Sequence, residues 1–198
     1  MKKAVLVSLT ILLMFGGSVF GQAAKAGRKA PDFTLPDLEG NEVTLSKVIG
    51  HGPVYVNFWA TWCSPCKKEI PELIELYNKY KDRGFKVLCI SVDNSRSVGK
   101  VKSFVKDRKM NFTVLLDSKR EVYQQKYKGH GIPYGFLLDN EGKVIYPSRG
   151  YIPGIGKLLE KKMQKYLLPA KSDSTTQEQA KEKPESKIKT PEKEETKK

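Results

Sequence analysis

The sequence predicts an α/β domain with a mixed central sheet flanked by helices, between about residues 25 and 168. Strand-like and helix-like apolar patterns alternate along this stretch, which favours parallel strands joined by helical crossovers. Near its end, two apolar runs flank Asp139-Asn140-Glu141-Gly142, a turn signal that indicates an antiparallel hairpin. The stretch is also long enough to bury a real core.

The N-terminal half of this domain predicts two short strands, one buried strand and one long helix. The short strands, at 33–35 and 43–45, flank a turn at 37–41. The apolar run at 54–58 is typical of a buried strand, and the helix is expected at 65–81. Apolar residues recur along that helix at helical spacing, namely Ile70, Leu73, Ile74 and Tyr77.

The C-terminal half continues the alternation and ends on a helix. The expected elements before the hairpin are a strand at 87–92, a helix at 98–108, a strand at 112–116 and a short helix at 121–127. The hairpin strands are expected at 135–138 and 144–146, and the closing helix at 155–166. We see no internal repeat, so one domain is expected.

Cys63 and Cys66 stand directly after the buried strand and at the start of the long helix. This placement puts the first sulfur at a helix N-terminus, where unpaired backbone N–H groups and the helix dipole stabilise a thiolate. A thiolate is the attacking species in disulfide exchange, and such an environment lowers a cysteine pKa. We therefore interpret the pair as a redox dithiol.

A zinc site and a purely structural disulfide are the alternatives for this pair. Beyond the pair, the cysteines and histidines are only Cys89, His51 and His130, which form no second ligand pair for zinc. A disulfide that spans two residues closes almost no loop, so it constrains the unfolded chain little. Cys89 lies in an expected strand and is interpreted as a small buried apolar residue.

The two ends of the chain differ in composition from the domain. Residues 1–24 combine a basic start, an apolar core and small residues, which indicates a signal peptide or, if it is uncleaved, a signal anchor. Residues 169–198 are rich in Lys and Glu and poor in apolar side chains, which predicts a disordered tail. The protein is therefore expected to be exported, to the periplasm or the outer face of the cytoplasmic membrane.

The formal net charge is +14, and most of it falls on the domain. A basic surface can attract anionic membranes or nucleic acid without specificity. Here the basic residues are scattered and do not interleave with aromatic residues, so no specific nucleic-acid binding is expected. Contact with a membrane is expected only if the N-terminal segment stays uncleaved.

Four stretches of the chain carry a resemblance to a known family. They are the hairpin segments 30–35 and 40–45, the active-site segment 56–71 and the loop and strand at 131–139. Over about residues 30–166 the chain resembles the thioredoxin superfamily, and within it the exported thiol–disulfide oxidoreductases of the TlpA/ResA type. The resemblance implies a thioredoxin-like fold with an N-terminal β-hairpin and an inserted strand and helix.

The insertion is expected at 93–118, because the chain between Cys63 and Pro133 is longer than in minimal thioredoxins. Two residues depart from related patterns. Asn57 stands where cytoplasmic thioredoxins are expected to carry a buried acid, so proton handling must differ. Tyr134 stands where this group often has threonine, and its bulk is expected to alter the groove for the partner.

The resemblance also implies residue roles. Cys63 is the nucleophile, Cys66 resolves the mixed disulfide, Glu69 tunes the pair and Pro133 is a cis-proline. Five further residues are expected to contact the partner: Trp62, Ser64, Pro65, Ile132 and Tyr134. Without the resemblance, Glu69 is an acid favoured by the helix dipole and Pro133 an ordinary turn proline.

The resulting hypothesis is an exported reductant of disulfides in partner proteins, with apocytochrome c as one candidate. A membrane thiol–disulfide carrier would donate the electrons, and no prosthetic group is implied. The same site in an oxidase or isomerase is the first alternative. A peroxidase of the peroxiredoxin kind is a weaker one, because the pattern P-x-x-x-T-x-x-C is missing around Cys63. A non-enzymatic binding module that holds partners in the groove is the third alternative.

Overall fold

The computed structural model describes residues 26–169 of the 198-residue chain. The expected signal segment lies outside the described residues, as does the expected tail apart from Pro169. The strands are β1 (Thr34–Pro36), β2 (Glu42–Thr44), β3 (Val54–Trp59), β4 (Lys86–Ser91), β5 (Thr113–Leu116), β6 (Tyr134–Leu138) and β7 (Val144–Arg149). The α-helices are α1 (Leu45–Val48), α2 (Ser64–Tyr80), α3 (Val98–Asp107) and α4 (Ile155–Met163). Short helical turns are η1 (Lys81–Arg83), η2 (Ser95–Ser97), η3 (Glu121–Lys126) and η4 (Gln164–Tyr166).

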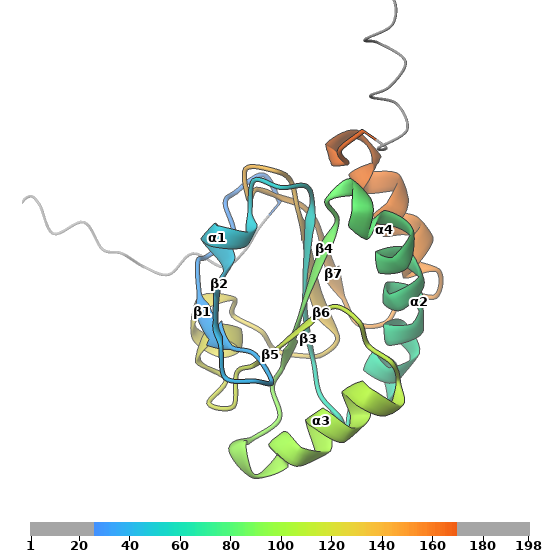
Figure 1. Ribbon diagram of the computed structural model, residues 1–198. Helices are drawn as coiled ribbons and strands as arrows, with labels where there is room; N and C mark the ends of the chain where they lie inside the picture. The colour runs from blue at the N-terminus through green and yellow to red at the C-terminus, as the bar shows by residue number, and fades with distance from the viewer. Residues whose placement is uncertain (1–25, 170–198) are drawn as a thin grey trace, which may run out of the picture. The chain divides into compact units, whose positions relative to one another are not determined.

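Five strands form the central sheet in the order β5-β4-β3-β6-β7 (Figure 1). β3 pairs in parallel with β4, and β4 with β5, whereas β6 and β7 join as antiparallel strands. The sheet is therefore mixed. β1 and β2 form a separate antiparallel hairpin, which touches the sheet edge through a bridge between Asp37 and Leu115.

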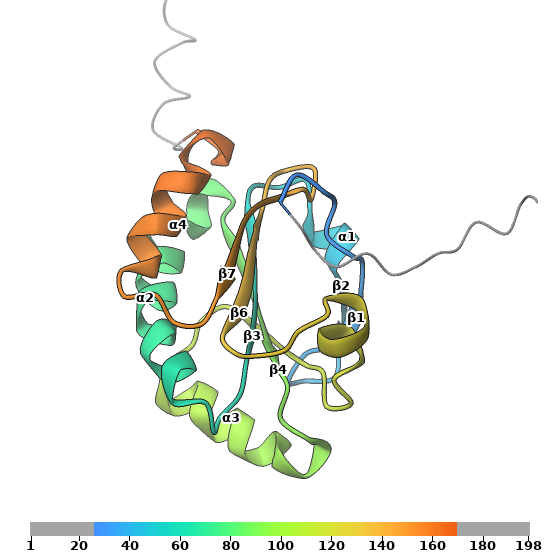
Figure 2. The same cartoon turned by 180° about the vertical axis from the view of Figure 1, so that it is seen from behind.

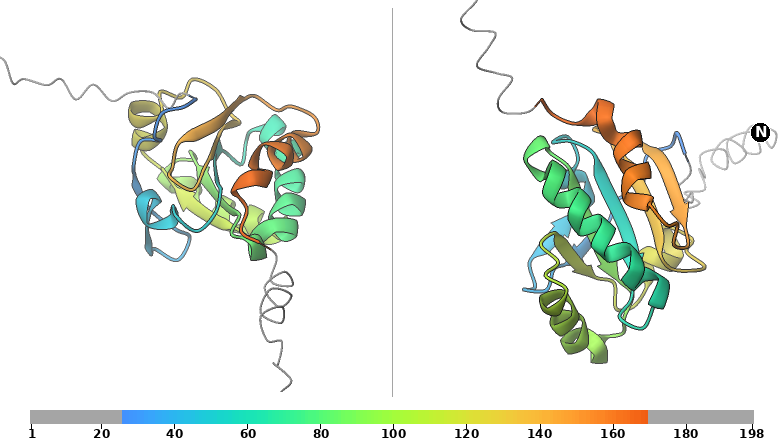
Figure 3. Two further views of the ribbon diagram at one scale, coloured as in Figure 1. Left: turned by 90° about the horizontal axis from the view of Figure 1, so that it is seen from above. Right: turned by 90° about the vertical axis from the view of Figure 1, so that its right-hand side faces the viewer.

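Helices and hairpin cover opposite faces of this sheet. The crossovers through α2 and α3 advance in the same direction, from β3 to β4 to β5, so right-handed connections put both helices on one face. α4 packs against α2 on that face, while α1 and the β1–β2 hairpin cover the other (Figures 1 and 2; Figure 3 gives two further views).

β3 lies at the centre of the core, and all six of its residues are buried. Its successive side chains point to opposite faces of the sheet. Phe58 packs against Tyr127 on the hairpin side, with ring centroids 5.1 Å apart. Trp59 packs against Phe104 of α3 at the same centroid distance, and Tyr55 shares the face of Trp59. The Tyr55 hydroxyl therefore lies between the sheet and α2.

The architecture confirms the predicted α/β class, the N-terminal hairpin and the inserted helix and strand, which are α3 and β5. The strand expected at 43–45 ends one residue early, because Leu45 starts α1 and is buried. β7 runs beyond the expected 144–146 and includes Pro147, which an edge strand tolerates. Within residues 26–169 no helix is both long and apolar enough to cross a membrane.

Candidate active site

The cysteine pair lies at the junction of β3 and α2. Cys63 is the N-cap residue of α2, and its Sγ is bonded to that of Cys66. The backbone N–H of Cys66 donates to the Cys63 Sγ at 3.2 Å. Pro65 sits in the first helical turn, where its missing N–H removes no helical hydrogen bond. Both cysteines are buried, whereas Ser64 and Pro65 are exposed.

The start of α2 favours negative charge on the Cys63 sulfur once the disulfide is reduced. The free N–H groups of the first turn and the helix dipole both stabilise an anion there. The first turn of α2 contains no acidic residue, and Lys67 and Lys68 follow the pair. Such an environment favours a thiolate at the Cys63 sulfur.

The loop before β6 contacts the disulfide at Cys63. The Ile132–Pro133 peptide bond is cis, as the resemblance implies, and the Ile132 carbonyl oxygen is 3.6 Å from the Cys63 Sγ. The Pro133 carbonyl accepts a hydrogen bond from the Gly150 N–H at 2.8 Å, so the residue directly after β7 supports the loop. Cys63 and the Ile132–Pro133 peptide are thereby brought together, as the resemblance implies.

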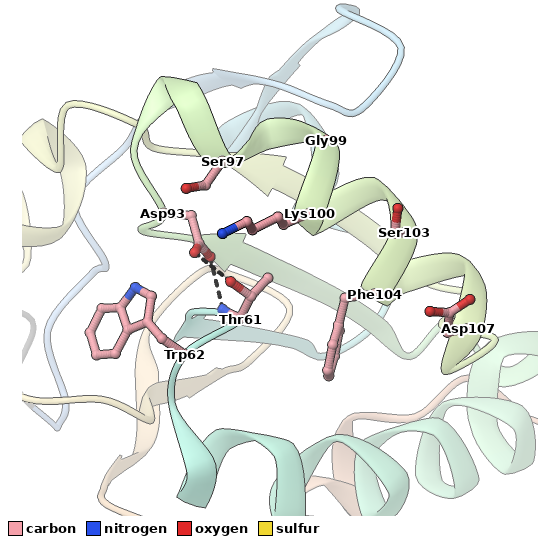
Figure 4. A pocket seen from close by; sticks show the side chains of 9 residues that line it. All are labelled: Thr61, Trp62, Asp93, Ser97, Gly99, Lys100, Ser103, Phe104 and Asp107. Carbon is pink, nitrogen blue, oxygen red and sulfur yellow. Dashed lines mark hydrogen bonds between the residues drawn. The ribbon is translucent and has the colours of Figure 1, made fainter.

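The loop that carries Trp62 is anchored by a buried aspartate (Figure 4). Asp93 accepts hydrogen bonds from the Thr61 backbone N–H at 2.9 Å and from the Thr61 hydroxyl at 2.7 Å. The Trp62 side chain is 61% exposed and borders a hollow of about 580 Å³ that extends to α3. Trp62 is thus a large apolar surface held beside the disulfide.

Two further hollows lie along the Ile132 loop. One, of about 490 Å³, reaches from Trp62 to Ile132 and is also lined by Arg120. The other, of about 200 Å³, is lined by Ile132, Tyr134 and Arg149. The Tyr134 ring is buried, and the Arg149 guanidinium lies 5.5 Å from the ring centroid. Tyr134 therefore lines the bottom of this hollow and exposes little of its own surface.

Glu69 lies one helical turn after Cys66 and is only 2% exposed. Burial raises the pKa of the Glu69 carboxyl from 4.5 to about 7. The Tyr55 hydroxyl, which donates to Glu69 Oε1 at 3.0 Å, opposes this shift, as does Asn57. The carboxyl group is therefore poised to gain or lose a proton near neutral pH.

Asn57 and Cys89 extend this buried polar region. They are partners in the parallel β3–β4 pairing, and Asn57 Nδ2 makes no hydrogen bond of regular geometry within the described chain. Burial raises the pKa of the Cys89 thiol well above its ordinary value, and the Glu69 carboxylate adds to the effect. Cys89 is free and buried, so it is a poor nucleophile at neutral pH.

Sequence reasoning missed Tyr55, Ser148 and Asp93. The alternation of β3 places Tyr55 on the same face as Asn57, which is a signal that a polar tip lies under α2. Ser148 and Asp93 reach the site only through pairing of distant strands, and no local pattern marks them. In residues 26–169 no three His, Cys, Asp or Glu side chains converge as metal ligands would.

The raised pKa of Glu69 predicts a specific pH dependence of stability. Between the unfolded value of 4.5 and the folded value of about 7, the unfolded chain releases a proton that the folded protein keeps. Stability is therefore lost as the pH rises through this window, by about 3 kcal/mol in total. Replacing Glu69 with glutamine is expected to remove this loss.

Denaturant unfolding of the oxidised protein at about pH 5 and about pH 8 measures this difference. Groups other than Glu69 contribute equally to the wild type and the variant. Parallel curves of unfolding free energy against pH for the two proteins would show that the carboxyl is not held neutral by burial.

Comparisons with known proteins agree with this geometry. The sequence profile of the AhpC/TSA family matches residues 26–147. The chain is 37% identical over 159 residues to the thiol-disulfide oxidoreductase ResA of Bacillus cereus, covering 75% of this chain and 90% of the relative. It is 38% identical over 124 residues to ResA of Bacillus subtilis, covering 63% and 67% of the two chains.

Solved structures are similar as well. A Chlorobium tepidum protein described as a thiol:disulfide interchange protein DsbE matches with a TM-score of 0.65 and 34% identity over 73% of this chain and 99% of that one. The thioredoxin domain of a Bacteroides vulgatus thiol-disulfide oxidoreductase matches with a TM-score of 0.63 and 31% identity over 71% and 99%. Fold, site and relatives agree, and the chain belongs to the AhpC/TSA family of thioredoxin-like proteins as a thiol–disulfide oxidoreductase of the ResA type.

Proposed function

We propose that this oxidoreductase is exported and reduces disulfides in partner proteins through the Cys63/Cys66 dithiol. The contact between the Cys63 sulfur, at the start of α2, and the Ile132 carbonyl carries the proposal, because it puts a nucleophile beside an edge that an extended partner chain can pair with. The signal-like residues 1–24 support export. Ser64-Pro65 between the cysteines resembles reducing members of the superfamily more than strong oxidants.

The first step is attack of the Cys63 thiolate on one sulfur of a partner disulfide. The S–S bond of the partner breaks, a Cys63–partner disulfide forms, and the other partner sulfur leaves as a thiolate that takes up a proton. The helix N-terminus stabilises the attacking thiolate, and the exposed Trp62 ring offers apolar surface to the partner. Ser64, Pro65, Ile132 and Tyr134 are proposed to complete the contact surface.

The second step is attack of Cys66 on the Cys63 sulfur. Cys66 is buried, so its thiol resists ionisation and needs a nearby base. We assign that role to Glu69, whose carboxyl has a pKa of about 7. The Cys66 proton passes to Glu69, the Cys63–Cys66 disulfide forms, and the reduced partner leaves. A membrane thiol–disulfide carrier would then return two electrons to the pair.

The direction of electron flow is testable with a peptide that carries a Cys-x-x-Cys-His segment, as an apocytochrome c does. The reduced full chain is expected to reduce the disulfide form of this peptide to its dithiol. Thiol alkylation and mass spectrometry measure the amount of dithiol peptide formed. Net oxidation of the dithiol peptide by the oxidised chain would instead support the oxidase or isomerase alternative.

A peroxidase is the remaining enzymatic alternative. A peroxiredoxin would carry its cysteine in the pattern P-x-x-x-T-x-x-C, which is missing here: Thr61 is only two residues before Cys63, and Asn57 stands where the proline would be. The Thr61 hydroxyl instead donates to Asp93. Negligible peroxide consumption by the reduced chain is the expected result.

A further inference from the structure

A chain of three buried polar groups links α2 to the central sheet. The Tyr55 hydroxyl oxygen is 3.0 Å from Glu69 Oε1 and 2.8 Å from the Ser148 Oγ. Tyr55, Glu69 and Ser148 are all buried, and they come from β3, α2 and β7. Buried polar groups are held together by such bonds because an unpaired one is costly.

Gly135 makes room for this arrangement. A Cβ atom at position 135 would lie 2.1 Å from the Tyr55 hydroxyl oxygen and 2.7 Å from the Ser148 Oγ. Any side chain there would therefore displace both hydroxyl groups. Gly135 pairs with Ser148 on one side and with Asn57 of β3 on the other, so its position is set by the sheet.

The number of hydroxyl protons decides the direction of the hydrogen bonds. An ionised Glu69 can only accept, so Tyr55 must donate its single proton to it. Tyr55 can then only accept from Ser148, whose hydroxyl donates to the phenol oxygen. When Glu69 is protonated, Tyr55 is free to accept from it and to donate to Ser148, so the same three groups satisfy both states.

We infer that Tyr55 is a positioning residue, which Ser148 orients in the space left by Gly135 and which holds the Glu69 carboxyl and stabilises its ionised form. The inference deepens the proposed function, since Glu69 matters to catalysis only if it accepts the Cys66 proton. Tyr55 itself touches neither a partner nor a sulfur in this account. It acts through Glu69.

Several groups besides Tyr55 face Glu69 and bear on its titration. Asn57 of β3 favours the ionised form, whereas the Glu72 carboxylate of α2 disfavours it. Cys89 of β4 and Tyr151, which follows β7, interact electrostatically with Glu69 but stay neutral around pH 7. Of these four, Asn57 also interacts with the Tyr55 hydroxyl. Tyr55→Phe leaves the Glu72, Cys89 and Tyr151 side chains themselves in place.

The test is the titration of the Glu69 carboxyl in the oxidised full chain, followed by carbon-13 NMR or by the infrared carboxyl band. Tyr55→Phe removes only the hydroxyl and is expected to raise the midpoint by about one pH unit, as loss of a hydrogen bond to a charged group predicts. Ser148→Ala is expected to raise it less. Tyr127→Phe is the matched control, because that buried hydroxyl donates to the Pro31 carbonyl instead.

An unchanged midpoint in folded Tyr55→Phe would overturn the inference, and so would an equal shift in Tyr127→Phe. If Tyr55→Phe does not fold, Ser148→Ala decides in the same way, since an unchanged midpoint there also overturns it. The titration does not depend on whether the protein reduces or oxidises its partners. Failure of the proposed role of Glu69 is seen separately, as a wild-type rate in Glu69→Gln, and failure of the proposed function as net oxidation of the dithiol peptide.

Discussion

Replacing Cys63 with serine is expected to lower the rate of disulfide reduction by about 1,000-fold or more, because a hydroxyl cannot replace the thiolate as nucleophile. Cys66→Ser is expected to behave differently. It keeps the attacking sulfur at the start of α2 but lacks the resolving thiol, so it should accumulate a mixed disulfide with the partner. Reduction of a peptide disulfide and mass spectrometry of the trapped species measure the two effects.

Cys89→Ala is the matched control for this pair of variants. Cys89 is buried in β4, and no disulfide joins it to the pair. Its loss is expected to leave the rate within about twofold of wild type and to cost stability only through the small cavity it creates. A rate for Cys63→Ser similar to that of wild type would contradict the assignment of the nucleophile.

Replacing Glu69 with glutamine is expected to slow the second step by about 100-fold at a pH above 7, since positioned general bases contribute on this order. The wild-type rate should rise with pH through the Glu69 pKa of about 7, where the carboxyl becomes ionised. The variant should lose this rise. Stopped-flow detection of the partner thiol released from the Cys63 mixed disulfide isolates the step.

Glu75→Gln is the control here, because Glu75 lies on the same helix but is exposed. Its pH profile should match that of wild type. The same profile in Glu69→Gln as in wild type would mean that Cys66 loses its proton to another group, and the proposed role of Glu69 would be wrong.

Local signals account for the parts of the fold that could be predicted. The apolar run of β3, the cysteine pair and the apolar spacing of α2 lie within one stretch of chain, so strand, site and helix follow from neighbouring residues. The hairpin turn before β7 is equally local. The thioredoxin-like connection of these elements came from the resemblance rather than from the patterns.

Contacts between distant residues account for what could not be predicted. Ser148 meets Tyr55 because β6 and β7 are added beside β3, and Asp93 meets Thr61 because β4 ends beside β3. No pattern of neighbouring residues in the sequence predicts either contact. The burial of Glu69, which shifts its pKa, likewise depends on α2 packing against the sheet. In the sequence, the departure at Asn57 indicates that proton handling differs, and the resemblance implies that Glu69 tunes the pair.

The central claim is that the Cys63–Cys66 pair donates electrons to its partners, and its reduction potential tests this most directly. The full chain would be equilibrated with glutathione mixtures and its thiols counted by alkylation. We expect a value between about −270 mV and about −230 mV, near that of thioredoxin and suited to a reductant with a dedicated electron supply. A value near about −120 mV would make the protein a disulfide donor and contradict the direction assigned here.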